Sequence, residues 1–292
     1  MTQPAVTFQI RQLEEQLNTR LFDRAQGRIS LTFAGTIALE YADRILALSE
    51  ELDSRMKELS GQLAGPLLIG ASTTIADFLL PQILGAFKAR YPAVVPRLSV
   101  ANSEAVHARI AERSLDLGFI EGDSHLPTLG ADVCCDDELQ VVCAPSHSLT
   151  KRQCATPQSL MEHAYISREV GSGTREVIDN YLEKAGLASD SLQVVMEAGS
   201  PEALKGLVAT GLGFAIMSGA TVTKEVRLGE LVRIPLSPRL IRHLSVVYPK
   251  ERFHSSLINS FVQFAKERLA AMQNENVFAS GHATPAAHGE TR

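Results

Sequence analysis

Apolar residues recur at helical spacing near the start of the chain. Val6, Ile10, Leu13 and Leu17 are separated by four, three and four residues, which predicts one buried helical face. Pro4 occupies a position that is favoured in a first helical turn. The opposite face carries Thr7, Gln9, Arg11, Gln12 and Gln16, whose side chains can donate to phosphates and base edges. An amphipathic helix of this kind more often covers a core, so periodicity alone leaves both interpretations open.

A basic turn follows this helix. Arg24, Gln26, Gly27 and Arg28 precede an alternating stretch that ends at Leu31, which predicts a short β-hairpin with Gly27 at its tip. A helix followed by a basic hairpin is the layout of a winged helix-turn-helix. In that layout the helix enters the major groove and the hairpin contacts the DNA backbone.

A long helix is predicted next, over residues 33–63, with Thr32 as its N-cap. Its length would be about 45 Å. A helix this long with one apolar stripe usually pairs with another helix, and the alternative is that it packs on its own chain. The stripe consists of Ile37, Tyr41, Ile45, Leu48, Leu52, Met56, Leu59 and Leu63.

From Pro66 onward, apolar strands alternate with amphipathic helices, which predicts parallel sheets with helices on both faces, an α/β fold. Two sets of such units indicate two lobes. We expect strands at residues 67–71, 97–100, 115–120, 139–144, 165–167, 192–197, 214–217 and 243–248, and helices at residues 74–91, 103–113, 173–185, 201–210 and 255–272. Residues 273–292 have no apolar period and are predicted to be disordered.

Composition narrows the class of protein. The chain has 292 residues, 45% hydrophobic and 21% charged, as expected for a soluble globular protein of about two domains. Its formal net charge is -5, so any nucleic-acid binding must come from a local basic patch. No run of eighteen apolar residues and no signal-peptide pattern are present. We therefore expect a cytoplasmic protein with no membrane partner.

Polar residues and glycines follow several predicted strands, where helices begin. In open α/β sheets, ligands bind beyond the carboxyl ends of strands, and helix N-termini hold anions. Arg168 or Arg175 can add a charge-assisted hydrogen bond, and Thr74 and Asp77 have the spacing of a capping box. Each such residue alone is an ordinary cap, but together they predict an anion site. The candidate effector-binding residues are Ser72, Thr73, Thr74, Asn102, Ser103, Ser167, Arg168, Gly173, Thr174, Gly199 and Ser200.

Motifs for enzymatic chemistry do not fit. Gly211-x-Gly213 precedes a strand and lacks the third glycine of a dinucleotide fingerprint, and Gly171-Ser172-Gly173 is not a nucleophile elbow. Cys143, His147 and Cys154 lack a fourth metal ligand at normal spacing, and the vicinal Cys134-Cys135 is a redox candidate only. We expect no enzyme, no catalytic residue, no cofactor and no metal.

The chain resembles the LysR-type transcriptional regulators. The match runs in order through Gln3-Pro4-Ala5-Val6-Thr7, Leu21-Phe22-Asp23-Arg24 and Leu31-Thr32-x-Ala34-Gly35, and extends to about Met272. The resemblance implies a partial winged helix-turn-helix and a long linker helix, joined to a two-lobed effector domain like the periplasmic binding proteins. The implied regions are residues 1–32 for DNA binding, 33–64 for the linker and dimerisation helix, 65–142 plus 243–272 for lobe 1, 143–242 for lobe 2 and 273–292 for the tail.

The same resemblance implies a function. Members bind promoter DNA as a dimer of dimers, respond to a small effector and act through RNA polymerase. For this chain we expect a homodimer or homotetramer that is controlled by a small anionic effector. The phrases around Ser72 and Gly173 look most like regulators of carbon fixation and sulfur assimilation. The expected DNA-binding residues are Gln3, Pro4, Thr7, Gln9, Arg11, Arg24 and Arg28.

The resemblance also has a departure. Family members carry a further helix and a half before the position of Thr2, so we expect a truncated or misassigned start. Two alternatives follow: a solute-binding receptor module without DNA function, and a dominant-negative partner that dimerises through residues 33–63.

Overall fold

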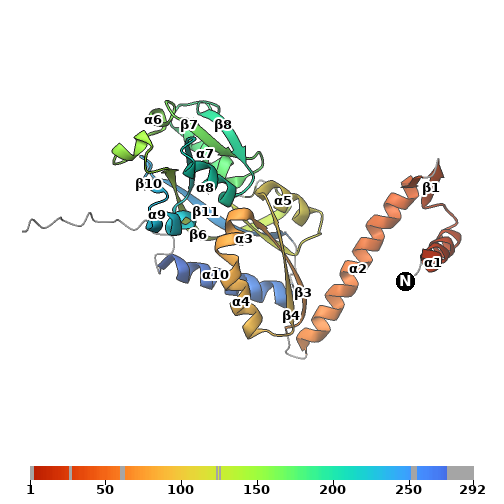
Figure 1. Ribbon diagram of the computed structural model, residues 1–292. Coiled ribbons are helices and arrows are strands. Elements are labelled where there is room, and N and C mark those ends of the chain that lie inside the picture. The colour runs from red at the N-terminus through yellow and green to blue at the C-terminus, as the bar shows by residue number, and fades with distance from the viewer. Residues whose placement is uncertain are drawn as a thin grey trace, which may run out of the picture. The chain divides into compact units, whose positions relative to one another are not determined.

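Two compact units make up the chain in the computed structural model, Met1–Gln62 and Leu63–Arg292 (Figure 1). The structure describes residues 3–25, 28–59, 63–122, 124, 126–250 and 255–274. The tail predicted from residue 273 onward lies outside the described residues from position 275, whereas residues 273 and 274 belong to the last helix.

The first unit contains a helix, a hairpin and a long helix. The elements are α1 (Gln3–Gln16), β1 (Phe22–Ala25), β2 (Arg28–Leu31) and α2 (Phe33–Leu59). The predicted hairpin is confirmed: β1 and β2 pair antiparallel, with Phe22 opposite Leu31. The turn before β1 is fixed by Glu14, whose Oε1 accepts the backbone N–H of Leu21 at 2.7 Å. The hairpin tip at Gly27 lies outside the described residues.

The start of α2 is also confirmed. Thr32 Oγ1 accepts the backbone N–H of Gly35 at 2.9 Å, which satisfies a free donor of the first helical turn. A Cβ at Gly35 would collide with the carbonyl oxygen of Leu21, so this close approach requires glycine. The predicted helix end is wrong, because Leu63 is not helical. Pro66 follows Gly65, and a proline disfavours the helical backbone conformation at the residue before it.

The apolar faces of both helices are largely exposed. Val6 and Leu13 of α1 are 40% and 43% exposed, and Leu17, directly after the helix, is 50% exposed, so the predicted burial of this face is wrong for the unit as described. An amphipathic face is buried only where a second element packs against it. The stripe of α2 is exposed as well, at Ile37, Tyr41, Ile45, Leu48, Leu52 and Met56. The linker helix therefore presents a continuous apolar surface in the single chain.

The second unit is a mixed sheet flanked by helices. Its strand order is β4-β3-β5-β11-β6-β9-β7-β8, with β10 paired to β6. The strands are β3 (Gly65–Ser72), β4 (Val94–Ala101), β5 (Leu117–Glu121), β6 (Leu129–Cys143), β7 (Ala164–Arg168), β8 (Gln193–Ala198), β9 (Phe214–Ser218), β10 (Val232–Ile234) and β11 (Leu240–Pro249). The helices are α3 (Thr73–Phe78), α4 (Leu80–Arg90), α5 (Ser103–Ala111), α6 (Pro157–Leu160), α7 (Gly173–Lys184), α8 (Pro201–Ala209), α9 (Thr223–Leu228) and α10 (Ser256–Asn274), with 3-10 turns η1 (Ser148–Lys151) and η2 (Gly219–Val222).

Two halves share this sheet. In the first half, β3 pairs parallel with β4 and β5, and in the second, β7 pairs parallel with β8 and β9, which confirms the α/β prediction. The long strands β6 and β11 join the halves: β6 pairs with β11 up to Leu139 and with β9 from Leu139 onward. Each half has its own core, centred on Phe87, Phe119 and Phe261 in the first and on Leu182 and Phe214 in the second.

The largest error in the predicted elements concerns β6, which begins at Leu129 and not at residue 139. Its first part carries several acidic side chains, which hide the apolar pattern of a strand. The structure shows that basic side chains pair with them. The pairs are Lys266 with Asp132, His243 with Asp136, Arg242 with Asp137 and Arg239 with Glu138.

A second error is the single helix predicted at residues 74–91. It is two helices that break at Leu79, because Pro81 lies in the first turn of α4 and has no N–H for a continuous helix. The capping box at Thr74 and Asp77 is wrong too, since the N-cap of α3 is Ser72 and no side-chain cap forms. The short elements α6, α9 and β10 were not predicted.

Candidate effector site

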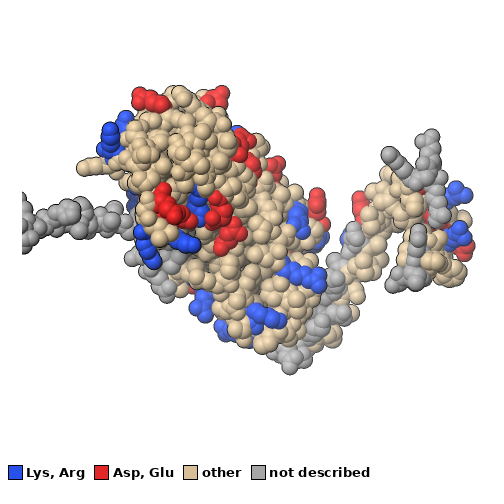
Figure 2. Space-filling model, in the orientation of Figure 1, with Lys and Arg blue, Asp and Glu red and all other residues tan. Residues whose placement is uncertain are grey.

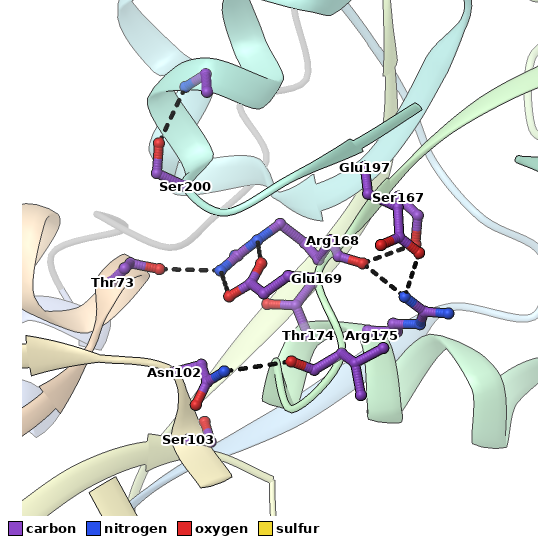
Figure 3. Close-up of polar contacts among 12 residues, drawn as sticks. Thr73, Asn102, Ser103, Ser167, Arg168, Glu169, Thr174, Arg175, Glu197 and Ser200 are labelled. Atoms are coloured by element: carbon purple, nitrogen blue, oxygen red, sulfur yellow. Dashed lines mark hydrogen bonds and ion pairs between the residues drawn. The ribbon is translucent and has the colours of Figure 1, made fainter. Parts of the chain in front are cut away.

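Helix starts from both halves meet at one place. The helices α3 and α5 begin directly after β3 and β4, and α7 begins after β7 in the other half. The loop at residues 168–171 connects them across the cleft (Figure 3). Asn102 Nδ2 donates to the carbonyl of Val170 at 3.2 Å, and the backbone N–H of Glu104 donates to the carbonyl of Gly171 at 3.2 Å. The halves are therefore in direct contact here.

Arg168 provides the positive charge of this region. The residue is only 3% exposed, and its Nη2 donates to Thr73 Oγ1 of the first half at 3.0 Å. The same guanidinium forms a two-point pair with Glu169, from Nε to Oε2 at 2.8 Å and from Nη2 to Oε1 at 3.0 Å. Figure 3 shows the two side chains facing each other. An anion that reaches Arg168 must therefore compete with the neighbouring carboxylate.

A buried ionic cluster lies beside the loop. The side chains of Arg242, Asp137 and Glu121 are 1%, 2% and 3% exposed. Arg242 Nε donates to Asp137 Oδ2 at 2.8 Å, and Nη1 lies 3.8 Å from Glu121 Oε1. Burial raises the pKa of Asp137 against the opposing charge of Arg242. Burial would raise the pKa of Glu121 too, but Arg242 and hydroxyl donors lower it below its ordinary value.

Hydroxyl groups connect the ionic cluster to a small cavity between the halves. Thr174 Oγ1 accepts from Arg242 Nη1 at 2.7 Å, and Ser218 Oγ donates to Asp137 Oδ1 at 2.6 Å. The cavity measures about 10 Å³, the scale of one water molecule. Its lining residues are Thr74, Arg168, Thr174, Pro201, Leu204, Met217, Ser218 and Thr221.

Most of the predicted effector residues lie together at this junction. Ser103 Oγ donates to Glu121 Oε2 at 2.9 Å, and Ser72 and Thr74 are buried beside the same carboxylate. Gly173 is packed so closely that a Cβ would lie 2.5 Å from the carbonyl oxygen of Glu121. The residues brought together are Ser72, Thr73, Thr74, Asn102, Ser103, Arg168, Gly173 and Thr174.

Of the predicted effector residues, Thr74, Arg168 and Thr174 line the cavity itself. Three others lie apart from the junction. Ser167 is buried inside β7 and donates to the carbonyl of Arg168 at 3.1 Å. Gly199 is exposed, with nothing within 4 Å of a Cβ there, and Ser200 caps α8 by accepting the N–H of Ala203. Arg175, the alternative cation, pairs with Glu197 at 2.6 Å.

Sequence reasoning missed five residues of the junction. Glu121 and Ser218 end apolar strands, so the strand-end rule that selected Ser72 would also have found them. Asp137 and Arg242 had no such signal, because they pair across β6 and β11, which are far apart in sequence. Thr221 lies in η2, three residues after the strand-end residue Ser218, and was missed with it.

A larger groove of about 700 Å³ lies between α6, α7 and residues 237–243. Its basic lining residues are Lys184, Arg239, Arg242 and His243, and the last three are paired with Glu138, Asp137 and Asp136 respectively. The small cavity, which adjoins the helix starts of both halves, is therefore the better effector candidate.

The four cysteines are free thiols. Cys135 and Cys143 are buried, Cys134 is half-buried and Cys154 is exposed. Burial raises the pKa of Cys134 and of Cys143 to about 11, and that of Cys135 to about 12. Among the described residues, no cluster of His, Cys, Asp and Glu has the arrangement of a metal site.

At mildly alkaline pH we expect iodoacetamide to label Cys154 quickly and the other three thiols slowly. The raised pKa of these three thiols leaves very little thiolate there, and thiolate is the reactive form. Peptide mass spectrometry of a labelling time course measures this order. Equal labelling of Cys135 and Cys154 in the folded protein would contradict the burial of the vicinal pair.

Two further observations concern the whole chain. None of the described helices is long and apolar enough to cross a membrane. On the face shown in Figure 2, acidic and basic side chains are interspersed over the larger unit.

The predicted DNA-binding residues lie in the first unit. In α1, Pro4, Gln9 and Arg11 are exposed and Thr7 is half-buried, whereas only the backbone of Gln3, Arg24 and Arg28 is described.

Comparison with known proteins identifies the family. Residues 60–270 match the LysR substrate binding domain, and residues 1–36 match the bacterial regulatory helix-turn-helix protein, lysR family. A probable RuBisCO transcriptional regulator of Chlorokybus atmophyticus is 33% identical over 96% of this chain and 90% of its own length. Another, of Cyanophora paradoxa, is 36% identical over 89% of this chain and 82% of its own.

Solved structures show the same fold. The Synechocystis CcmR regulatory domain in complex with 2-PG has a TM-score of 0.64 and 26% identity, covering 72% of this chain and 98% of that one. A Corynebacterium glutamicum OxyR mutant, H2O2-bound, has a TM-score of 0.67 and 22% identity, covering 95% and 86%. The chain thus belongs to the LysR family and is a DNA-binding transcriptional regulator with a two-lobed effector-binding domain.

Proposed function

We propose that the regulator is controlled by a small anionic metabolite that binds between its two lobes, at Arg168 and the surrounding helix starts. The lobes are residues 65–142 with 243–272, and residues 143–242. The observation that carries the proposal is the convergence of the buried Arg168 guanidinium with the starts of α3, α7 and α8 on a cavity shared by both halves. Helix N-termini and arginine are the groups that proteins use to hold anions.

Effector binding requires a change in the contacts between the halves. The cavity of about 10 Å³ is too small for a metabolite, so the halves must separate or rotate when the effector enters. The hydrogen bonds that must adjust are those of the loop at residues 168–171 with Thr73, Asn102 and Glu104. The effector thereby favours one arrangement of the lobes over another.

A thermal-shift titration of the chain against a panel of metabolite anions tests this proposal. A ligand at one hundred times its dissociation constant stabilises the folded state by about 2.7 kcal/mol, which raises the melting temperature measurably. If no anion at millimolar concentration raised it, the proposal would be rejected. Small molecules are the named ligands of two structural neighbours, the CcmR domain with 2-PG and the QuiR domain with shikimate, and support this kind of effector.

The DNA contacts are also proposed. We assign α1 to the major groove, with Thr7, Gln9 and Arg11 as base or backbone contacts, and the β1–β2 hairpin to the phosphates through Arg24 and Arg28. The exposed stripe of α2 would pair with the same stripe of a second copy, giving a homodimer or homotetramer. We further propose a cytoplasmic protein without enzymatic activity that contacts RNA polymerase at its promoters.

Arg28→Ala should weaken promoter binding about equally for all sequences. Loss of one phosphate contact should also make the slope of log affinity against log salt shallower by about 0.9. Band-shift titrations at several salt concentrations measure both quantities. The control is Arg152→Ala, which removes an exposed arginine of the second unit and should leave the slope unchanged. An unchanged slope for Arg28→Ala would remove the hairpin from the DNA interface.

A further inference from the structure

Two hydroxyl groups that line the cavity, those of Thr221 and Ser218, donate their protons to groups of the protein. Thr221 Oγ1 donates to the backbone carbonyl of Ser218 at 2.8 Å, and a carbonyl can only accept. Ser218 Oγ accepts the N–H of Ala220 at 3.3 Å and donates to the carboxylate of Asp137 at 2.6 Å. A hydroxyl has one proton. Thr221 and Ser218 therefore offer only lone pairs to anything that enters the cavity.

Thr174 and Arg168 have the opposite polarity. Thr174 Oγ1 accepts from Arg242 Nη1 at 2.7 Å, and a guanidinium can only donate, so the proton of Thr174 is not used in that bond. Arg168 offers N–H donors only. The cavity thus presents acceptors at Ser218 and Thr221, and donors at Thr174 and Arg168.

We propose that this cavity selects an anion that also carries a hydroxyl group, because its fixed hydrogen-bond polarity needs a ligand with both a donor and a charged acceptor. The inference rests on the proposed effector site and specifies its ligand class. An ammonium group in place of the hydroxyl is disfavoured, because none of the described residues that line the cavity is acidic. Hydroxy acids and protonated phosphates fit, and fully deprotonated oxyanions do not.

Phosphate and sulfate test the proposal with the whole chain. The two anions have the same tetrahedral shape, but near neutral pH phosphate keeps at least one hydroxyl and sulfate has none. At matched ionic strength, we expect phosphate to bind about tenfold more tightly than sulfate, since an unpaired buried acceptor is worth about that factor. Thermal-shift titration gives both affinities. Sulfate binding as tightly as phosphate would overturn the inference while leaving the anion site intact.

Two isosteric variants separate polarity from shape. Thr221→Val removes an acceptor, so it should reduce the phosphate-to-sulfate preference by several-fold. Thr174→Val makes the same chemical change in the same cavity but removes a donor, so it should weaken both anions and not reduce the preference. Equal changes of the preference in both variants would overturn the inference. Failure of both anions to bind the parent protein would overturn the effector site itself and this inference with it.

Discussion

Arg242→Met should destabilise the effector unit by about 3–5 kcal/mol, the largest loss that we expect from any single substitution. The substitution removes the cation that lies beside two fully buried carboxylates, Asp137 and Glu121. Methionine fills similar space, so the loss would come from unpaired charge and not from a cavity. Urea unfolding of the parent and the variant measures the change in the free energy of unfolding.

A matched control lies three residues away on the same chain segment. Arg239 pairs with Glu138 at 2.8 Å, but its side chain is 65% exposed. Water screens such a pair, so Arg239→Met should leave the free energy of unfolding close to that of the parent. If the two variants were destabilised alike, the loss at Arg242 would reflect the loss of an arginine in general, and the buried cluster would not be the cause.

Arg168→Met should weaken effector binding by about tenfold to one hundredfold, and Glu169→Gln should strengthen it. A charge-assisted hydrogen bond is worth about 1.5–3 kcal/mol, and Arg168 is the cation that lines the cavity. Glu169 holds the same guanidinium at two points, so its carboxylate competes with the effector. The amide of glutamine keeps the size of the side chain but removes the competing charge.

Isothermal titration of the three proteins with the best anion from the panel gives their affinities. Arg175→Met is the control, because Arg175 lies outside the cavity lining, in contact with Glu197. We expect this variant to bind within about twofold of the parent. Weaker binding by Glu169→Gln would mean that Glu169 helps to position Arg168 and is not a competitor.

Local patterns in the sequence predicted the elements whose burial follows a simple period. The hairpin β1–β2, the cap at Thr32 and the parallel strands around β3 and β7 are of this kind. The first part of β6 was missed because four acidic residues break its pattern, and their partners lie about one hundred residues or more away. Long-range pairing of this sort leaves no local signal.

The candidate site was likewise only partly predictable from the sequence. Helix-start residues such as Thr73, Asn102 and Thr174 could be selected from the rule that ligands bind beyond strand ends. Their hydrogen-bond polarity could not be selected, because it depends on which buried group holds each hydroxyl. Arg242 decides the polarity of Thr174, and nothing in the sequence near either residue indicates that contact.

The continuous sheet has a mechanical consequence. Among the described strands, β6 and β11 are the two that run through both halves, at residues 129–143 and 240–249. The halves are therefore joined by paired strands. If the halves rotate on effector binding, as proposed above, we expect the rotation to twist this two-stranded ribbon. The twist of β6 and β11 would then link the occupancy of the cavity to the angle between the halves.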